Sequence, residues 1–226
     1  MSVLSLPATQ TSAFRITHPA RYSPEILDVI AEELDGVPGP VLDPFAGTGR
    51  IHDLGRGDTF GVEIEAEWAM LHPRTLRGDA TALPFLDESF GAVATSPCYG
   101  NRMADRYDGR DGSRRYTYRI ALGRELSDAS AAGLQWGAAY RDLHRKAWQE
   151  THRVVRPGGK VIVNVADHVR RGEHQHVTEF HWNALQETGL RPVRRRCVGT
   201  RGMRHGANRD ARIGGEFVLV LEKPAG

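Results

Sequence analysis

A chain of 226 residues with 40% hydrophobic and 26% charged residues has the composition of one soluble globular domain and leaves little room for a second. No apolar run is long enough to cross a bilayer, and the stretch Met1–Ala13 lacks the basic start and apolar core of a secretory signal. Two cysteines, Cys98 and Cys197, cannot by themselves form a disulfide framework or a zinc cluster, and His174 and His176 lack a third ligand. We therefore expect a reducing, cytoplasmic setting and no metal or membrane partner.

The net charge of +2 conceals an uneven choice of basic residues, because 27 of the 30 are arginine. A GC-rich genome would explain that excess, and so would a nucleic-acid partner, since the planar guanidinium suits phosphates and base edges. The arginines are densest over 102–124 and 191–212, a clustering that base composition alone does not require.

Short apolar runs alternate with amphipathic stretches along the chain. A helix is expected over Pro24–Leu34, with Ser23 as its N-cap, and is followed by strands at Val41–Asp43, Thr59–Ile64, Thr75–Arg77 and Ala92–Thr95. The second half predicts a helix over Trp136–Val154, a strand at Lys160–Val165 after the turn 156–159, a helix over Val177–Thr188 ended by Gly189, and strands at Val193–Val198 and Glu216–Glu222. This alternation predicts an α/β fold, with helices on both faces of a mainly parallel sheet and ligands at the carboxyl ends of its strands.

The region from Gly100 to Gly133 departs from this pattern. It is polar and rich in arginine and glycine, with Tyr107, Tyr116 and Tyr118 interleaved. A connection of that length in a compact domain predicts a functional loop or lid, or else a disordered segment.

The strongest local motif is a predicted strand that runs into a glycine loop, Val41-Leu42-Asp43-Pro44-Phe45-Ala46-Gly47-Thr48-Gly49. A phosphate-binding P-loop would continue with Gly-Lys-Ser/Thr, but Arg50 follows here. A dinucleotide fingerprint would place a third glycine where the chain has His52. Two interpretations remain, a plain tight turn and a loop that holds a nucleoside without phosphate contacts, and the flanking residues favour the second.

Carboxylates follow the first three predicted strands: Asp43, Glu63 and Asp79. S-adenosylmethionine (SAM) has no phosphate, so its site needs acceptors for the ribose hydroxyls and the adenine amino group, and negative charge near its sulfonium and ammonium groups. Glu63 stands where the ribose acceptor would be, Asp79 where the adenine edge would lie, and Asp43 near the methionine portion.

The segment Asp-Pro-Phe-Ala-Gly-Thr-Gly at 43–49 resembles motif I of the SAM-dependent amino methyltransferases that act on nucleic-acid bases, and the resemblance extends from His18 to Leu221. It implies one methyltransferase domain over 1–226 with the class I, Rossmann-like fold, a seven-stranded, mainly parallel sheet whose last strand is antiparallel. Within it, 1–23 forms an N-terminal segment, of which 18–25 resembles the family segment that closes the SAM site, and about 100–133 forms a basic substrate loop. The cofactor contacts that it implies are Tyr22, Asp43, Phe45, Gly47, Gly49, Glu63, Ile64, Asp79 and Ala80.

The segment Thr95-Ser96-Pro97-Cys98-Tyr99 resembles the catalytic motif of the same family, (Asp/Asn/Ser)-Pro-Pro-(Tyr/Phe). An exocyclic amino nitrogen is a poor nucleophile because its lone pair is delocalised into the ring. Ser96 Oγ and the Pro97 carbonyl would each accept one amino hydrogen and so favour the tetrahedral nitrogen that attacks the methyl group. Tyr99 would stack on a base flipped out of its helix.

Cys98 departs from this pattern, because the family usually has a second proline there. The replacement either weakens the turn or changes only its packing, and a nucleophilic cysteine, as in pyrimidine-carbon methylation, is a further alternative. Serine in the first position resembles the enzymes that methylate cytosine N4 more than those that methylate adenine N6.

The basic stretches supply the predicted nucleic-acid contacts: Arg102, Arg106, Arg115, Arg195 and Arg201. Solvated loops are the alternative interpretation for both stretches. Asp167 and His168, after the predicted fifth strand, could line the pocket, although the sequence does not favour this interpretation. The partner would be DNA, in a bacterial or phage restriction-modification setting; the alternatives are an RNA guanine-N2 methyltransferase and a non-catalytic nucleic-acid-binding protein on the same fold. The sequence does not specify the oligomeric state.

Overall fold

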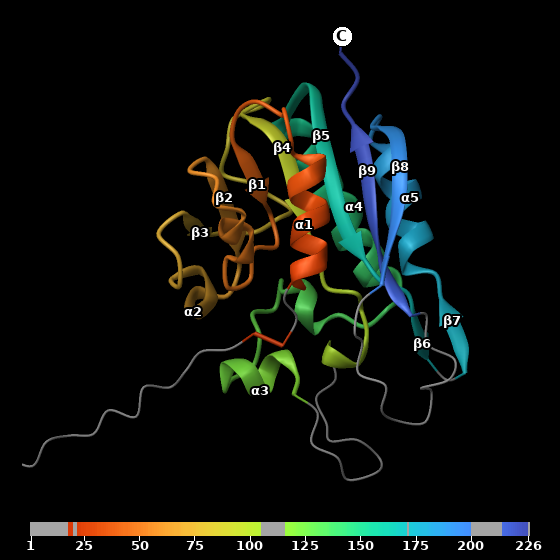
Figure 1. The fold of residues 1–226 in the computed structure, drawn as a ribbon. Coiled ribbons are helices and arrows are strands. Elements are labelled where there is room, and N and C mark those ends of the chain that lie inside the picture. Colours follow the sequence, from red (N-terminus) through yellow and green to blue (C-terminus); the bar gives the residue numbers. More distant parts are fainter. Residues whose placement is uncertain (1–17, 20–21, 105–115, 171, 200–213, 226) are drawn as a thin grey trace, which may run out of the picture.

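The structure is a computed structural model that describes residues 18–19, 22–104, 116–170, 172–199 and 214–225. Seven strands form one twisted sheet in the order β3-β2-β1-β4-β5-β9-β8 (Figure 1). Their bounds are β1 Val41–Asp43, β2 Thr59–Glu63, β3 Thr75–Arg77, β4 Phe90–Thr95, β5 Val155–Val165, β8 Arg191–Gly199 and β9 Gly215–Glu222. The first five run parallel, and β9 is antiparallel to both β5 and β8. The predicted seven-stranded, mainly parallel sheet is confirmed.

Helices cover both faces of the sheet, with α1 on one side and α4 and α5 on the other (Figure 1). The helices are α1 Pro24–Glu33, α2 Ala66–Ala69, α3 Tyr118–Leu122, α4 Ala138–Val154 and α5 Val177–Glu187. Three short 3-10 helices, η1 Arg50–Leu54, η2 Arg102–Ala104 and η3 Ala131–Gly133, and a hairpin of β6 His168–Arg170 with β7 Glu173–Gln175, complete the described elements.

Hydrophobic side chains point alternately to the two faces of the sheet along each strand, and they form a core on each face. Val161 and Leu219 pack with Trp148 of α4, whereas their neighbours Ile162 and Val220 pack with Ile26 of α1. All of these side chains are fully buried. Successive strand residues point to opposite faces, so one strand serves two cores.

Most predicted elements lie within two residues of their observed bounds. Ser23 caps α1 as predicted, with its Oγ accepting a hydrogen bond from the Ile26 amide at 3.3 Å. One strand was predicted too short, because β5 begins at Val155, which pairs with Phe90. The predicted turn at 156–159 lies inside β5 as an irregularity, where Gly158 has a positive φ and donates to the Lys223 carbonyl at 2.8 Å.

The predicted long loop at 100–133 is also partly wrong, because its second half is structured. Thr117 caps α3, and η3 follows at Ala131–Gly133. Its polar composition concealed these short elements, whose lengths are below what hydrophobic periodicity can detect.

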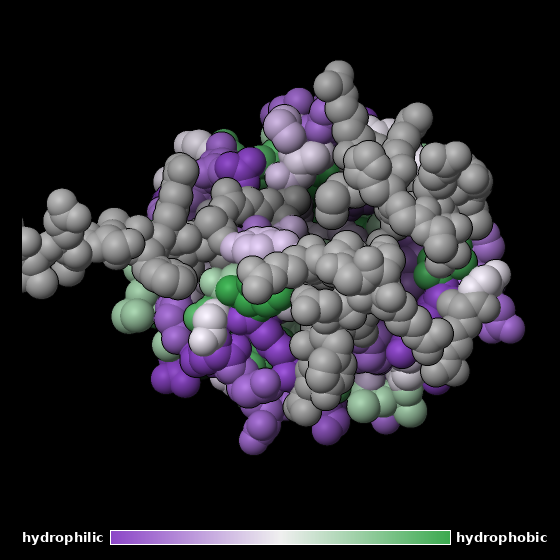
Figure 2. Space-filling view, turned by 90° about the horizontal axis from the view of Figure 1, so that it is seen from below, coloured by the Kyte–Doolittle hydropathy of each residue, from purple (hydrophilic) through white to green (hydrophobic). Residues whose placement is uncertain are grey.

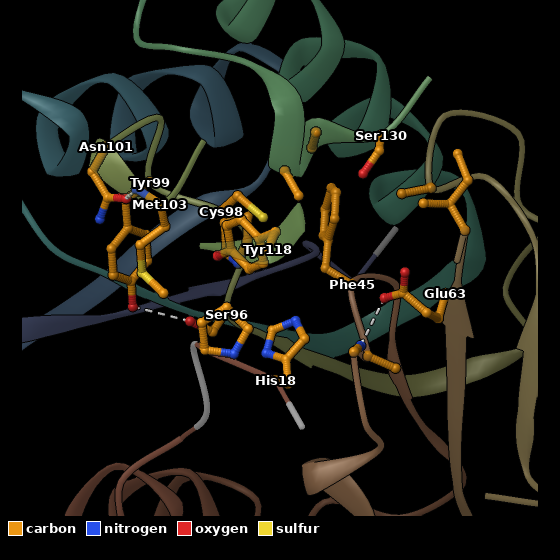
Figure 3. Close-up of a pocket in the computed structure, with 18 of the residues that line it drawn as sticks. His18, Phe45, Glu63, Ser96, Cys98, Tyr99, Asn101, Met103, Tyr118 and Ser130 are labelled. Atoms are coloured by element: carbon orange, nitrogen blue, oxygen red, sulfur yellow. Dashed lines mark hydrogen bonds between the residues drawn. The ribbon is translucent and has the colours of Figure 1, made fainter. Parts of the chain in front are cut away.

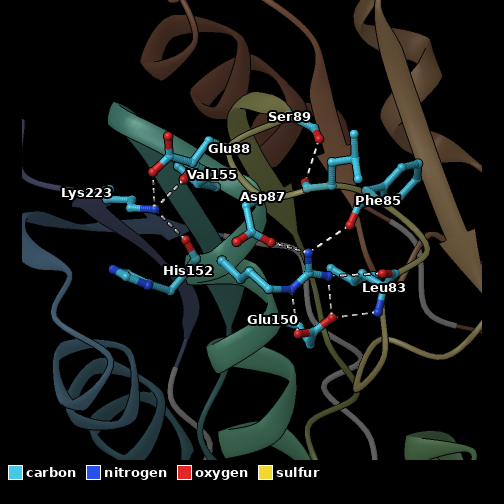
Figure 4. A network of polar contacts seen from close by, with 11 residues as sticks. Leu83, Phe85, Asp87, Glu88, Ser89, Glu150, His152, Val155 and Lys223 are labelled. Carbon is cyan, nitrogen blue, oxygen red and sulfur yellow. Dashed lines mark hydrogen bonds and ion pairs between the residues drawn. The ribbon is translucent and has the colours of Figure 1, made fainter.

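A polar network fixes the amino end of β4, at the end of the sheet opposite the carboxyl ends of its parallel strands (Figure 4). Arg153 of α4 donates to the carboxylates of Glu150 and Asp87 and to the carbonyls of Leu83 and Phe85, at 2.7–3.0 Å. The connection between β3 and β4 is thereby tied to α4. Among the described residues, no helix is long and apolar enough to pass through a bilayer.

Candidate active site

A cavity of about 510 Å³ opens at the carboxyl ends of the parallel strands, where the strand order reverses between β1 and β4. It is the position at which open α/β sheets bind ligands. Figure 2 views the molecule from this end, and the coloured surface there mixes hydrophilic side chains with small hydrophobic patches. The predicted site residues in the cavity wall are Tyr22, Phe45, Gly47, Glu63, Ile64, Asp79, Ala80, Ser96, Pro97 and Tyr99.

Two predicted cofactor residues lie outside this wall. Asp43 is 1% exposed, and it accepts hydrogen bonds from Tyr22 Oη at 2.9 Å, Thr95 Oγ1 at 2.6 Å and the Phe45 amide at 3.0 Å. Burial raises its pKa to about 6. Asp43 therefore ties the N-terminal segment and the end of β4 to the glycine loop. Gly49 is the N-cap of η1 and has a φ of 80°, in the left-handed region that favours glycine.

Glu63 connects the end of β2 to the glycine loop. Its carboxylate accepts the Gly47 amide at 2.8 Å and the Glu65 amide at 2.9 Å (Figure 3). Burial of the carboxyl group raises its pKa to about 7. Gly47 has a φ of 53°, and a Cβ there would come within 3.2 Å of the His18 ring, so glycine suits both the turn and this close approach.

Asp79 follows β3, and its Oδ1 accepts hydrogen bonds from the amide and the hydroxyl of Thr81, both at 2.8 Å. This turn holds the carboxylate at the cavity wall beside Ala80. Together, Glu63 and Asp79 place two acceptors on one side of the cavity.

Ser96 lies on the other side, directly after β4. Its Oγ is 3.0 Å from Tyr99 Oη (Figure 3) and 3.3 Å from Asn164 Nδ2. Tyr99 Oη donates to Glu216 Oε2 at 2.8 Å, and Asn164 Nδ2 donates to the same oxygen at 2.7 Å. Hydrogen bonds with Ser96, Asn164 and Glu216 thus hold the hydroxyl group of Tyr99. Tyr99 also forms part of the cavity wall.

Cys98, the departure from the family pattern, contacts Tyr118 and lies at the cavity wall. Burial raises the pKa of its thiol to about 12, so the thiol is protonated at neutral pH. That protonation argues against a nucleophilic cysteine. The Cys98 carbonyl accepts a hydrogen bond from Tyr140 Oη at 2.6 Å, which anchors the backbone at this position.

Sequence reasoning missed several residues of the site. Asn164 lies 68 positions from Ser96, and Glu216 lies 117 positions from Tyr99, so no local motif reveals these contacts. Glu65 is fully buried and accepts from Arg124 Nη2 at 2.8 Å and from the Ser127 amide at 2.9 Å. It thereby fixes the segment whose residues 129–132 form part of the cavity wall.

Asp167 and His168 both line the cavity, which was the less favoured interpretation of the sequence. Asp167 also caps α5, since its Oδ1 accepts the Thr178 amide at 2.7 Å. Neither ring nitrogen of His168 has a hydrogen-bond partner among the described residues. Within the same part of the chain, no group of three or more histidine, cysteine or acidic side chains is arranged to hold a metal ion.

The predicted nucleic-acid contacts fall in different places. Arg106, Arg115 and Arg201 lie outside the described residues, and Arg102 lies in η2, shortly after the predicted catalytic motif. Arg195 lies on the edge strand β8, away from the cavity wall, where it pairs with Glu179 at 2.8 Å and stacks over Trp182 at 4.2 Å.

The other described arginines of β8 also pair with acidic residues. Arg194 and Arg196 reach Glu33 of α1 at 3.7 and 3.2 Å, and Arg191 reaches Glu222 at 3.1 Å. These pairs fasten the edge strand to the helices and to β9.

No known family model matches the sequence, and no curated protein matches it. Among solved structures, a SAM-dependent methyltransferase from Methanosarcina mazei is similar with a TM-score of 0.56 and 13% identity, over 87% of this chain and 98% of the other. A 1,6-didemethyltoxoflavin-N1-methyltransferase from Burkholderia thailandensis, solved with S-adenosylhomocysteine, has a TM-score of 0.52 and 16% identity over 88% and 76% of the two chains.

The [4+2]-cyclase SpnF is equally similar, with a TM-score of 0.55 and 17% identity over 89% of this chain and 81% of the other. The fold therefore carries more than one reaction, and only the site can indicate the chemistry. What the topology and these similarities establish together is that the chain has the class I SAM-dependent methyltransferase fold.

Proposed function

We propose that this protein is a SAM-dependent methyltransferase that modifies an exocyclic amino group of a DNA base, with cytosine N4 preferred over adenine N6. One observation carries the proposal: Ser96 and Pro97 face the same cavity as Gly47 and Glu63. A methyl donor held by the glycine loop and an amine held by Ser96 would then share one enclosed space, as methyl transfer requires.

The hydrogen-bond acceptors of the cavity suit SAM. Glu63 would accept the ribose hydroxyls, and Asp79 with the backbone at Ala80 would face the adenine ring. When bound, SAM supplies a methyl group on a positively charged sulfur. The carboxylates on this side of the cavity complement that positive charge.

The catalytic turn provides the second half of the chemistry. Ser96 Oγ and the Pro97 carbonyl would each accept one hydrogen of the target amino group, which directs the nitrogen lone pair toward the methyl group. Tyr99 presents its ring beside them and would stack on the target base.

DNA is the proposed polymer because the motif pair at 43–49 and 95–99 resembles the DNA amino methyltransferases, and because arginines of the segment 102–124 follow the catalytic turn directly. Serine in place of aspartate favours cytosine. Arg102, Arg106, Arg115 and Arg201 are the proposed backbone contacts, and Arg195 would join them only by exchanging its pairing with Glu179 for a phosphate.

The test is incubation with isotope-labelled SAM and either DNA or RNA, followed by nucleoside mass spectrometry. We expect N4-methylcytosine from DNA. Ser96→Ala should lower turnover by about 100-fold or more, with SAM affinity nearly unchanged. Ser89→Ala, an exposed serine at the opposite end of the sheet, is the matched control and should behave as the wild type.

Each contrary result identifies a different error. Methylated guanine from RNA would reassign the substrate, whereas calorimetry without SAM binding would favour a non-catalytic nucleic-acid-binding protein. If Ser96→Ala abolished SAM binding, the serine would belong to the cofactor site instead of the catalytic turn.

A further inference from the structure

A continuous set of hydrogen bonds leads from Ser96 at the cavity to Glu216 at the start of β9. Ser96 Oγ is 3.0 Å from Tyr99 Oη, and Tyr99 Oη is 2.8 Å from Glu216 Oε2. Asn164 of β5 braces the set, with its Nδ2 3.0 Å from Tyr99 Oη and 2.7 Å from Glu216 Oε2. Ser96, Tyr99 and Glu216 also line the cavity, so both ends of the set can reach its contents.

The chemistry of the end group fixes the direction of these bonds. An ionised carboxylate only accepts, so Tyr99 must give its single hydroxyl hydrogen to Glu216. The Tyr99 oxygen is then an acceptor toward Ser96, and the Ser96 hydrogen points to Tyr99. A lone pair of Ser96 Oγ therefore stays available to a substrate amine, which is the state that the proposed reaction requires.

Asn164 supports this direction. Its amide could in principle be turned over, but Oδ1 would then lie 2.7 Å from the Glu216 carboxylate, an acceptor facing an acceptor. In the orientation observed, Asn164 is 1% exposed, and Oδ1 has no hydrogen-bond partner among the described residues. An unpartnered buried oxygen costs free energy, so the contacts made by Nδ2 must determine the orientation.

We propose that Ser96, Tyr99 and Glu216 form the path by which the proton leaves the methylated amine; this inference rests on the proposed function. The nitrogen lone pair forms the bond to the methyl carbon, and the carbon–sulfur bond breaks with its electron pair going to sulfur. The nitrogen then carries one proton too many. That proton passes to Ser96 Oγ as the Ser96 hydrogen passes to Tyr99 Oη and the Tyr99 hydrogen passes to Glu216 Oε2.

The step balances in charge, because an ammonium-like cation and a carboxylate become a neutral amine and a carboxylic acid. It is also downhill, since loss of the proton restores conjugation between the nitrogen and the ring, which makes that cation a strong acid. Glu216 is partly exposed at the cavity and can release the proton to solvent after product leaves. Glu216 acts through Tyr99 and Ser96, so it is a positioning residue and the terminal proton acceptor.

The test compares single-turnover methylation of DNA by wild type, Glu216→Gln and Glu216→Asp, together with SAM affinity by calorimetry. Glutamine keeps the size of the side chain but removes its proton affinity. Its amide can also donate to Tyr99 and so reverse the direction of the hydrogen bonds. We expect Glu216→Gln to lower the methyl-transfer rate constant by about 100-fold, with SAM affinity and the KM for DNA changed by less than about threefold. Glu216→Asp should regain part of the rate.

Two further variants distinguish proton transfer from a structural role. In Glu216→Gly, added formate should restore part of the rate, which a merely structural defect would not permit. Tyr99→Phe should lower the rate to a similar level, and combining it with Glu216→Gln should cost little more, because both interrupt one path. Glu222→Gln, on the same strand but paired with Arg191 away from the cavity, is the matched control and should retain wild-type rates.

Different results would refute the proton path and the proposed function. If wild type methylates DNA and Glu216→Gln matches it within about twofold, the proton path is refuted and the proposed function stands. Absence of formate rescue together with additive losses in the double variant would also refute it. If wild type methylates neither DNA nor RNA, the proposed function is overturned and the proton path with it. Should Glu216→Gln fail to fold, Glu216→Asp and Tyr99→Phe carry the same comparison.

Discussion

Replacing Tyr140 by phenylalanine would remove the hydroxyl group that anchors the Cys98 carbonyl. Trp148 Nε1 donates to His181 Nδ1 at 3.1 Å, so that ring nitrogen has no hydrogen of its own. His181 is fully buried, and burial holds its pKa well below the usual value, so the ring is neutral and its hydrogen lies on Nε2. Nε2 then donates to Tyr140 Oη at 2.8 Å, and Tyr140 Oη donates to the Cys98 carbonyl at 2.6 Å.

The cost of this substitution follows from the two groups that lose their partner. Without the hydroxyl, the buried N–H of His181 and the carbonyl of Cys98 are both unpaired, and each unsatisfied group costs about 1–3 kcal/mol. We expect Tyr140→Phe to lower the free energy of unfolding by about 2–4 kcal/mol. Since Cys98 adjoins Pro97, methyl transfer should slow as well, with less effect on SAM affinity.

Urea unfolding followed by tryptophan fluorescence measures the first effect, and single-turnover methylation measures the second. Tyr116→Phe, a tyrosine that is 50% exposed, should leave the unfolding free energy unchanged. In the Tyr140→Phe background, Cys98→Pro should recover turnover more than stability, because a proline ring restrains the turn without replacing the lost partner. An unfolding free energy within about 0.5 kcal/mol of wild type would refute the donor assignment.

Four further predictions address the packing at Gly91, the cofactor site and the far end of the sheet. Gly91→Ala would place a Cβ 2.0 Å from the Pro38 carbonyl oxygen and should lower the free energy of unfolding by about 3 kcal/mol or more. Gly57→Ala is the control, because a Cβ there would have no atom within 4 Å and should leave stability nearly unchanged. Thermal denaturation measures both variants. The ribose hydroxyls would stabilise the ionised form of Glu63, whose pKa is raised to about 7, so SAM affinity measured by calorimetry should weaken as pH falls below 7; a constant affinity between pH 8 and 6 would contradict this. The same raised pKa means that Glu63 binds its proton more tightly in the folded protein than in the unfolded chain. The ligand-free protein should therefore lose stability as pH rises through about 7. Arg153→Met should lower the unfolding free energy by about 1–2 kcal/mol and leave SAM affinity unchanged, as urea titration and calorimetry would show.

The sheet could be predicted from the sequence because its signals are local. Short apolar runs bounded by turn residues mark β1 to β4, and the glycine loop follows β1 directly. Glu63 and Asp79 follow their strands along the chain, and the parallel sheet brings them to the same cavity. Wherever a residue's role depends on its place at a strand end, chain order and topology suffice to locate it.

The residues that the sequence did not reveal are those whose partners are distant in the chain. Glu216 was visible only as the first residue of a predicted strand, yet it contacts Tyr99 across 117 positions. Arg195 shows the converse case, because a cluster of arginines suggests phosphate contacts, whereas the structure pairs this residue with Glu179. Charge clusters and isolated acids acquire meaning only from what packs against them, and one sequence does not contain that information.

Contacts with residues distant in the chain also explain how Cys98 can stand where the related motif has proline. A second proline would restrain the backbone by its ring alone, a local device that the sequence displays. Here Tyr140, His181 and Trp148 restrain the same position through three hydrogen bonds that reach the Cys98 carbonyl from α4 and α5. The departure from the motif is therefore compensated in the core behind it, and the proposed catalytic turn remains anchored while the neutral thiol faces Tyr118.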